Sequence, residues 1–433
     1  MAQPRQRPAE QEAGDVENTV TELLRRACAD LPPDTVVRSI GFASMAESGV
    51  LVDDSGAARS PIIAWHDTRG DAQAFALPAA TAAAFPGITG LPVGHVPSVF
   101  KLAWLRDNGI DLRHKQWLSV PEYVVTRLGG DRVSERSLLG RTGLLNLHTG
   151  ALWPAALDFL GVGPELLPPM VSAGFPAGRV RHDFPVPRAR DAVLTVAGHD
   201  HAVAAAALGC GTPGSALDSF GTAEAFYASG PAVPDPATVA TLAEAGVSVY
   251  PHVVAGATGF IAGTRTGLVL KRVLTLLGAA EEPHRSALDL AALDEQGDET
   301  EDVLLSGFSM FDRDITLTLL SDSITPARLW RAAVAGGNRE AAALLAALRQ
   351  ADVMVDRLVI AGGWTRMASV VAARRTLADH VEVSASALPG AAGAAALGRW
   401  AASGAGLDSP PGPTWFTAPY RPSPPQLQEA APR

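Results

Sequence analysis

Residues 193–208 have the sequence VLTVAGHDHAVAAAAL. The apolar run 193–196 is typical of a buried strand, and the alanine-rich run 202–208 predicts a helix that Gly209 closes. Asp200 lies between the two, at the carboxyl edge of the strand, where open α/β sheets bind their ligands. A carboxylate in this place can accept a proton from a hydroxyl nucleophile. The pattern alone fits an ordinary helix N-cap at least as well.

Strand-like and helix-like segments alternate on both sides of this stretch, which indicates an α/β fold. Upstream we expect strands at 35–43, 49–53 and 61–65 and helices at 16–29, 98–107 and 121–128. Downstream we expect strands at 216–220, 223–227, 358–361 and 381–383 and helices at 266–277, 344–348 and 391–402.

The length of 433 residues suits two domains of ordinary size. We place the boundary in the loop-like run GTPG at 211–214. This gives an N-terminal domain at 15–212 and a C-terminal domain at 213–408. We expect residues 1–14 to be a disordered lead and residues 409–433 to be a loosely held, proline-rich tail.

The composition limits the classes of partner. The net charge of -10 does not predict the basic surface that binds nucleic acid or anionic lipid. No uncharged run is long enough to cross a bilayer, and the polar start has no apolar signal-peptide core. The two cysteines, Cys28 and Cys210, form no CxxC pair and imply neither zinc nor a disulfide framework. We therefore expect a cytoplasmic protein that binds neither nucleic acid nor membrane.

Two further segments combine a strand with glycines. Residues 218–224, DSFGTAE, predict a tight turn at Gly221-Thr222, whose backbone N–H groups and hydroxyl suit phosphate oxygens. Residues 359–367, VIAGGWTRM, predict a strand that ends at Gly362-Gly363 and is followed by a helix. Glycines there let the backbone approach a flat ligand or a phosphate, and a helix N-terminus favours an anion. Each pattern alone also fits a structural turn.

Polar side chains also follow two of the upstream strands. Glu47 ends the segment SMAE at 44–47, and Trp65, Asp67 and Arg69 lie in WHDTR at 65–69. Carboxylates, an arginine and an aromatic face form a mixture of groups that suits a sugar. The alternative is a surface ion pair beside a core tryptophan. The chain contains neither a GxxxxGK[ST] phosphate loop nor a GxSxG nucleophile elbow.

The order of these segments resembles the FGGY carbohydrate kinases, which include xylulose, glycerol, fucose and ribulose kinases. The resemblance runs from about Asp15 to Trp400. Residues 64–69 are similar to the W-x-D-x-R segment of the family, and FKLAWL at 100–105 is similar to its Lys-Leu-x-Trp-Leu helix. The segments that resemble the catalytic, phosphate, adenosine and late helix motifs are 198–200, 221–222, 267–271, 362–363 and 393–395.

This resemblance implies two actin-like, ribonuclease-H-like domains with a cleft between them. It implies phosphoryl transfer from MgATP to a hydroxyl of a sugar or polyol, with Asp200 as the general base. The implied substrate-binding residues are Glu47, Trp65, Asp67, Arg69 and His199. The implied nucleotide-binding residues are Gly221, Thr222, Gly267, Lys271, Gly362, Gly363 and Met367. The cofactors are ATP and Mg²⁺ with no metal ligands assigned, and a homodimer is compatible with the resemblance.

One departure from the family concerns its first hairpin, which carries an Asp-x-Gly-Thr phosphate motif. This chain contains no Asp-x-Gly-Thr, and its first matching element is the helix expected at 16–29. The resemblance therefore implies that the first strands of the N-terminal sheet are missing. Either the start codon is placed too late, which we favour, or the chain is a truncated and inactive relative.

Among substrates we favour a ketopentose or a polyol. Ala46 stands where glycerol kinases of the family carry an arginine that grips glycerol, which argues against glycerol. A non-catalytic sugar-binding or regulatory protein is the main alternative. A metal-dependent phosphohydrolase that uses His199, Asp200 and His201, with His182 and Asp183, is a weaker one, because neighbours on a strand face opposite sides.

Overall fold

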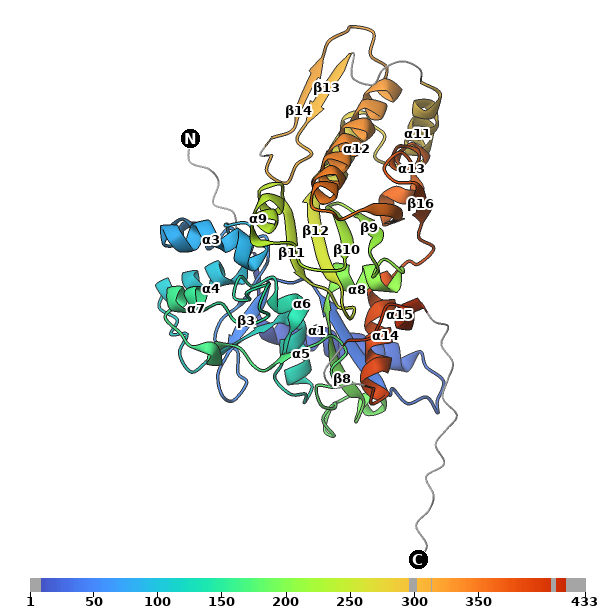
Figure 1. Ribbon diagram of the computed structural model, residues 1–433. Coiled ribbons are helices and arrows are strands. Elements are labelled where there is room, and N and C mark those ends of the chain that lie inside the picture. Colours follow the sequence, from blue (N-terminus) through green and yellow to red (C-terminus); the bar gives the residue numbers. More distant parts are fainter. Residues whose placement is uncertain (1–8, 296–301, 313, 406–409, 418–433) are drawn as a thin grey trace, which may run out of the picture.

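The computed structural model describes residues 9–295, 302–312, 314–405 and 410–417. It has two lobes (Figure 1). We call residues 9–207 the N-lobe and residues 214–383 the C-lobe. The C-lobe is built on a six-stranded sheet of order β11-β12-β10-β9-β15-β16, whose strands β15 and β16 run parallel to β9. The N-lobe is built on the parallel pair β2-β8 and a separate four-stranded sheet of order β1-β4-β3-β5.

The strands of the N-lobe are β1 (Glu10–Gln11), β2 (Ser39–Ser44), β3 (Gly49–Val52), β4 (Ile62–Ile63), β5 (Gln116–Ser119), β6 (Ser134–Glu135), β7 (Met170–Val171) and β8 (Val193–His199). Those of the C-lobe are β9 (Gly214–Phe220), β10 (Glu224–Gly230), β11 (Val247–Pro251), β12 (Thr258–Thr264), β13 (Val303–Ser306), β14 (Thr316–Leu319), β15 (Val355–Ala361) and β16 (His380–Val383).

The helices of the N-lobe are α1 (Ala13–Ala29), α2 (Asp71–Phe75), α3 (Ala79–Thr89), α4 (Ser98–Asp107), α5 (Val120–Arg127), α6 (Arg136–Leu139), α7 (Pro154–Leu160), η1 (Pro164–Leu166), η2 (Pro187–Ala189) and α8 (Asp200–Ala207). The later helices are α9 (Pro236–Glu244), α10 (Thr266–Leu276), α11 (His284–Asp294), α12 (Pro326–Gln350), η3 (Gly363–Arg366), α13 (Ala368–Arg374), α14 (Pro389–Ala402) and α15 (Thr414–Thr417).

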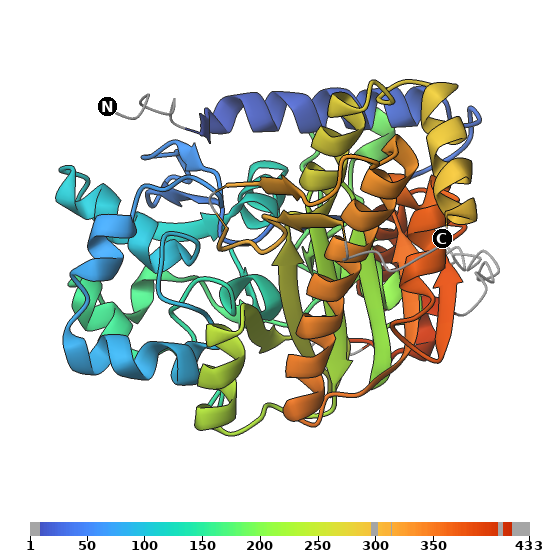
Figure 2. The ribbon, with the colours of Figure 1, turned by 90° about the horizontal axis from the view of Figure 1, so that it is seen from above.

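Two helices lie between the lobes. The core around α8 and α14 takes side chains from β8 and from one face of the six-stranded sheet, and α14 also packs on β2. The opposite face of the large sheet is covered by α9 and α12. The outer face of β2-β8 packs on α1, α5 and α6, and Figure 2 shows α1 along one side of the molecule. Because helices cover the faces of these sheets, the carboxyl edges of the parallel strands remain as the places where ligands can bind.

The strand and helix predictions are confirmed in type, with shifts of a few residues at the ends. The largest error concerns α12, which has 25 residues where only 344–348 was predicted. Thr325 caps its start, and its two interior glycines are needed for packing. A Cβ at Gly336 would meet the Phe308 ring at 2.5 Å, and one at Gly337 would meet Thr266 at 2.2 Å. Sequence propensity counts those glycines as helix breakers, and the tertiary packing overrides it.

Three expected boundaries need correction. Residues 9–14 are not a disordered lead, because β1 pairs with β4 and α1 begins at Ala13. The tail is ordered at 414–417, where the Trp415 indole donates a hydrogen bond to the Ala396 carbonyl at 2.8 Å.

Helix α14, assigned to the C-terminal domain, packs mainly on β2, β8 and α8. Its small residues allow this close approach, since a Cβ at Gly393 would meet the Val203 carbonyl at 2.4 Å. Residues 1–8 and 418–433 lie outside the described part of the chain.

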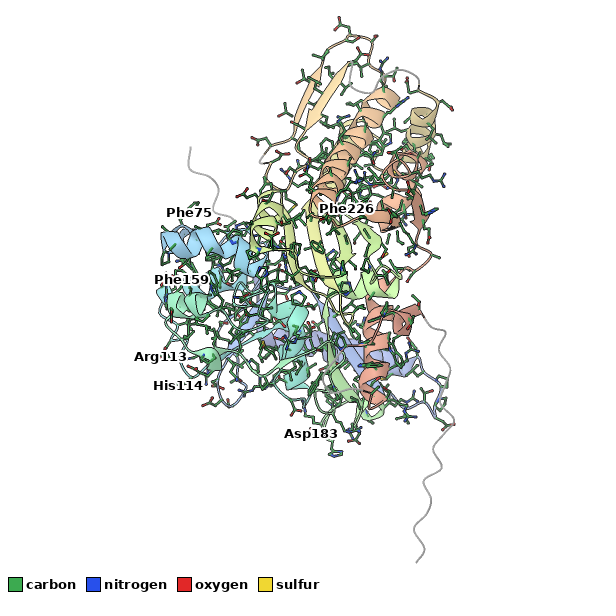
Figure 3. The ribbon with its side chains drawn as sticks, in the orientation of Figure 1. Phe75, Arg113, His114, Phe159, Asp183 and Phe226 are labelled. Carbon is green, nitrogen blue, oxygen red and sulfur yellow. The ribbon has the colours of Figure 1, made fainter. Side chains whose placement is uncertain are left out.

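The outer elements are more exposed. Strands β13 and β14 form an arm at the end of the C-lobe (Figure 1). Figure 3 shows Phe226 inside the C-lobe and Phe75 at the outer edge of the N-lobe, where it is 91% exposed. No helix in the described ranges is both long enough and apolar enough to cross a membrane.

Candidate active site

The first cluster lies at the carboxyl edge of β2 and β8. These strands are parallel, with Ser44 opposite His199, so the segment after β2 and the start of α8 leave the sheet side by side. Glu47 follows β2, and Asp200 is the first residue of α8. The N-cap of α8 is His199, so Asp200 does not have the capping role that the pattern also allowed.

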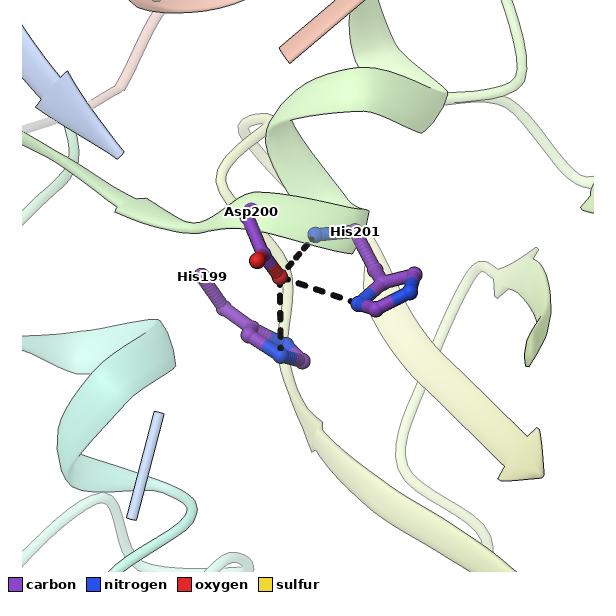
Figure 4. Close-up of side chains that lie close together, drawn as sticks. All are labelled: His199, Asp200 and His201. Atoms are coloured by element: carbon purple, nitrogen blue, oxygen red, sulfur yellow. Dashed lines mark hydrogen bonds and ion pairs between the residues drawn. The ribbon is translucent and has the colours of Figure 1, made fainter. Parts of the chain in front are cut away.

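Asp200 presents one carboxylate oxygen to the protein and the other away from it (Figure 4). Its Oδ1 lies 2.7 Å from the backbone N of His201, 2.9 Å from His201 Nδ1 and 3.3 Å from His199 Nε2. No contact to Oδ2 is found among the described residues, and the Asp200 side chain is 42% exposed. The geometry therefore fixes the carboxylate and leaves one oxygen available to a ligand.

Burial acts to raise the pKa of Asp200, but the hydrogen bond from His201 and the nearby His199 outweigh it and hold the pKa below its usual value. Asp200 is therefore an ionised acceptor at neutral pH. Burial lowers the pKa of His199 to about 3, so its ring is neutral. His199 is buried, and both of its ring nitrogens contact the protein, because Nδ1 faces the Tyr250 hydroxyl. This geometry leaves His199 poorly placed to bind substrate itself.

Glu47 is joined to this centre through a buried arginine. Arg141 Nε donates to Glu47 Oε1 at 2.6 Å, and the Arg141 guanidinium lies 5.1 Å from the centre of the Tyr250 ring. Glu47 has a positive φ of 58°, a conformation that costs energy in a non-glycine residue and often marks a functional position. Tyr250 therefore touches both His199 and the partner of Glu47.

Trp65, Asp67 and Arg69 form a separate cluster. Asp67 accepts hydrogen bonds from the backbone N and the Nε of Arg69 on one oxygen, and from the Arg69 guanidinium and the Ala9 backbone on the other. Arg69 lies over the Trp104 ring at 5.0 Å. The buried ammonium of Lys101 donates to the Trp65 carbonyl at 3.2 Å, and burial lowers its pKa to about 8. No contact in the described residues joins this cluster to Asp200.

The predicted nucleotide residues meet at the matching edge of the C-lobe sheet. Strands β9 and β15 are parallel, with Ser219 opposite Ala361, so the Gly221 turn and Gly362 emerge together. Two of the glycines there have no room for a side chain. A Cβ at Gly267 would lie 1.9 Å from the Gly221 carbonyl, and one at Gly362, where φ is 114°, would lie 2.3 Å from the Phe220 carbonyl. These glycines serve close packing of the backbone around the turn.

A cavity of about 780 Å³ opens beside this edge. Its lining residues come from the Gly221 turn, from α10, from the segment 280–289 and from 363–367. Five of the predicted nucleotide residues are among them: Gly221, Thr222, Lys271, Gly363 and Met367. The other two, Gly267 and Gly362, do not line it and pack against the backbone of residues 220–222. Asp200 is not in the lining, so the two clusters are separate in this conformation.

A buried ion cluster supports the turn from the inside. The guanidinium of Arg374 in α13 lies 3.0 Å from Asp218 Oδ2 and also pairs with Glu224, and all three side chains are almost fully buried. Burial, together with neighbouring Glu224, raises the pKa of Asp218 well above its usual value. Because Asp218 and Glu224 flank the Gly221-Thr222 turn, this cluster fixes the turn to α13.

Metal binding has one geometric candidate in the described ranges. The ligand atoms of His199, Asp200 and His201 lie within 4.8 Å of one another. The expectation that the two histidines diverge is wrong, because the strand ends at His199 and the chain turns into a helix. Two imidazoles and one carboxylate suit a transition metal rather than Mg²⁺, which prefers oxygen ligands. The cluster therefore does not fit Mg²⁺.

Fold and site together define a two-lobed α/β protein with an oriented carboxylate in one lobe and a glycine-bordered cavity in the other. Comparison with known proteins then gives the family. The profile of the N-terminal domain of the FGGY family of carbohydrate kinases matches residues 1–209. Residues 1–209 therefore match the N-terminal domain of this family, and the matched relatives are named as sugar kinases.

Individual relatives agree with this assignment. Xylulose kinase of Streptomyces rubiginosus is 29% identical over 90% of this chain and 78% of that protein. L-fuculokinase of Salmonella typhi is 27% identical over 36% of this chain, but the match spans only 34% of that protein. The ligand-bound crystal structure of xylulose kinase from Lactobacillus acidophilus superposes with a TM-score of 0.82 at 16% identity, over 96% of this chain and 88% of the other. The expected two-domain, actin-like fold is thus confirmed.

Sequence reasoning missed three residues that organise the site: Arg141, Tyr250 and Arg374. Arg141 lies in GRTG at 140–143, where flanking glycines gave a weak signal of a special backbone position. Tyr250 and Arg374 lie inside an ordinary strand and an ordinary helix, and no local pattern marks them.

Proposed function

We propose that this chain phosphorylates a hydroxyl of a sugar or polyol with ATP, and that Asp200 is the general base. The observation that carries the proposal is the carboxylate of Asp200, whose Oδ1 has three protein contacts while the partly exposed side chain leaves Oδ2 available. A hydroxyl that donates to Oδ2 is oriented for attack and can pass its proton to the base. The match to this family supplies the reaction class.

The predicted nucleotide-binding residues contribute by holding the parts of ATP in place. Gly221 and Thr222 lie where the γ-phosphate side of ATP fits, and Gly267 and Lys271 lie near the inner phosphates. The adenine end fits near Gly362, Gly363 and Met367. Mg²⁺ carried on the phosphates would neutralise charge in the transfer. Because Asp200 lies outside the cavity, the lobes must close to bring hydroxyl and phosphate into line.

For the substrate we propose a ketopentose or a polyol that contacts Glu47, with Trp65, Asp67 and Arg69 forming the outer wall. The support is the naming of several relatives as xylulose kinases. Asp67 already accepts four hydrogen bonds from the protein, which favours a supporting role for the Asp67–Arg69 pair over direct sugar contact.

A non-catalytic sugar-binding or regulatory protein is the second candidate. Two observations favour it: the absence of an Asp-x-Gly-Thr motif from the sequence, and the pairing of β2 with β8 alone in the described residues. Such a protein would keep the cleft and lose turnover.

The deciding experiment measures ADP release from MgATP over a panel of ketoses, aldoses and polyols. We expect sugar-dependent release that Asp200→Asn lowers by about 10² to 10⁴-fold, because the base is removed. Asp183→Asn is the matched control, since its side chain is 83% exposed and lies at the far end of the N-lobe (Figure 3). It should leave the rate unchanged.

Calorimetry and elemental analysis separate the alternatives. Sugar binding without ADP release by well-folded protein would overturn the kinase proposal in favour of the binding protein. Stoichiometric zinc or manganese together with phosphatase activity would point to a metal-dependent hydrolase at His199, Asp200 and His201.

A further inference from the structure

The inference concerns Tyr250, a C-lobe residue on β11 that reaches the N-lobe site. Its side chain is fully buried in the core shared with α8 and α14. Its hydroxyl lies 2.5 Å from His199 Nδ1, and its ring carries the Arg141 guanidinium at 5.1 Å. One side chain of the nucleotide-binding lobe therefore contacts both arms of the N-lobe cluster, the one that ends at Asp200 and the one that ends at Glu47.

We propose that Tyr250 is a positioning residue through which the C-lobe sets the catalytic geometry of the N-lobe: its hydroxyl orients His199 and thereby Asp200, and its ring supports Arg141 and thereby Glu47. The proposal rests on the proposed kinase function for the roles of Asp200 and Glu47. The contacts themselves are independent of that function.

The first arm depends on which ring nitrogen of His199 carries the proton. A neutral imidazole has one N–H, and an ionised carboxylate can only accept. The contact of 3.3 Å between Nε2 and Asp200 Oδ1 is therefore attractive only when Nε2 is protonated. Nδ1 must then accept a hydrogen bond, and burial keeps the Tyr250 hydroxyl protonated by raising its pKa well above 10. Tyr250 thus donates to His199, and the Nε2–H of His199 faces Asp200 Oδ1.

Removal of the Tyr250 hydroxyl would take away the donor that fixes the His199 ring. Nδ1 would then lie buried without a donor, which is costly, and the ring would lose the contact that fixes its orientation. The contact between Nε2–H and the Asp200 carboxylate would weaken, because nothing on the Nδ1 side would hold the ring against it. His201, whose Nδ1 and backbone N also face Oδ1, would remain as the other neighbour of the base.

The second arm depends on the ring of Tyr250. Arg141 is 8% exposed, pairs with Glu47 through Nε and Nη2, and has no hydrogen-bond partner for its buried Nη1 in the described chain. A guanidinium over an aromatic face gains electrostatic attraction that offsets part of this loss of hydration. The ring therefore holds Arg141, and with it the strained backbone position of Glu47.

Two substitutions at Tyr250 separate the arms. Tyr250→Phe keeps the ring and removes the hydroxyl, so kcat should fall about tenfold, the worth of one hydrogen bond to a charged network, with the sugar KM within about twofold. The acid limb of the kcat/KM profile should move to higher pH, because the contact of the His199 N–H that stabilises the Asp200 carboxylate weakens. Tyr250→Leu should also raise the sugar KM. Tyr123→Phe, at a buried tyrosine of α5, is the matched control and should change none of these.

A double-mutant cycle tests whether the hydroxyl acts through His199. His199→Gln keeps an N–H donor but loses the ring that joins Tyr250 to Asp200. If the two residues form one chain, Tyr250→Phe combined with His199→Gln should lower kcat no further than His199→Gln alone. Independent, multiplying losses would overturn the proposal, as would an unchanged pH profile in Tyr250→Phe.

A spectroscopic measurement separates failure of this inference from failure of the proposed function. Nitrogen-15 NMR of His199, assigned by its loss in His199→Gln, reports the tautomer whether or not the chain turns over sugar. We expect the Nε2–H form in the unmodified chain, with the Nδ1 resonance shifted by the hydrogen bond that it accepts, and loss of that shift in Tyr250→Phe. An Nδ1–H tautomer in the unmodified chain, or no change in Tyr250→Phe, would overturn the proposal.

Discussion

The two lobes place their ligand residues in the same way, but the strand pairs that carry these residues have different numbers of neighbouring strands. Each places its ligand residues at the carboxyl edge of a parallel strand pair, β2-β8 in the N-lobe and β9-β15 in the C-lobe. In the C-lobe that pair lies inside six strands. In the N-lobe the pair stands alone among the described strands, and every residue of β2 from Ser39 to Ser44 is only half-buried.

The difference shows where each site takes its rigidity. The C-lobe turn is fixed from within its own lobe by Arg374, Asp218 and Glu224. The N-lobe cluster instead takes a contact from across the interface, through Tyr250, and β2 is further supported by α14. A parallel strand is normally buried on both faces, so β2 depends on its neighbours in other layers.

The lobes also differ in how they compensate buried carboxylates, and the largest expected effect tests this. Arg374→Met removes the cation from Asp218 and Glu224 and should lower the free energy of unfolding by about 3–5 kcal/mol. Urea denaturation of the intact chain measures it. Arg375→Met, at the exposed neighbouring position, should cost less than about 0.5 kcal/mol. Equal losses for the two variants would mean that the cluster does not stabilise the C-lobe.

In the N-lobe Glu47 also has an arginine partner, but at Glu122 and Glu135 a proton takes the place of one. Burial raises the pKa of Glu122, and likewise of Glu135, to about 7. The folded state therefore holds a proton that the unfolded chain loses near pH 4.5, and this stabilisation is complete below that pH. As pH rises to about 7 it is lost, which for Glu122 amounts to about 3 kcal/mol.

Glu122→Gln should flatten the fall in unfolding free energy between pH 5 and pH 8, as measured by urea titrations at each pH. The exposed Glu244→Gln is the matched control and should keep the slope of the unmodified chain. A Glu122→Gln variant as steep as the unmodified chain would show that the buried acid does not titrate in this window.

The sequence predicted the parts of both sites that follow strand ends. Asp200, Gly221 and Gly362 were found because each follows a predicted strand, and parallel pairing then brings such positions together. The same reasoning could not place Tyr250 or Arg374, which reach their partners across long sequence separations from ordinary elements. It also could not give the roles of His199 and Asp67, because those depend on which atoms the protein already uses.

The last prediction compares the two lobes with the same substitution. Phe260 on β12 is 1% exposed inside the large sheet, and Phe42 on β2 is half-buried. Phe260→Ala should lower the free energy of unfolding by about 3–4 kcal/mol, because it leaves a cavity in a closed core. Phe42→Ala should cost about 1–2 kcal/mol, since less apolar surface leaves water when β2 folds. Equal costs in urea denaturation would mean that β2 is covered in solution by something outside the described contacts, and the contrast between the lobes would then disappear.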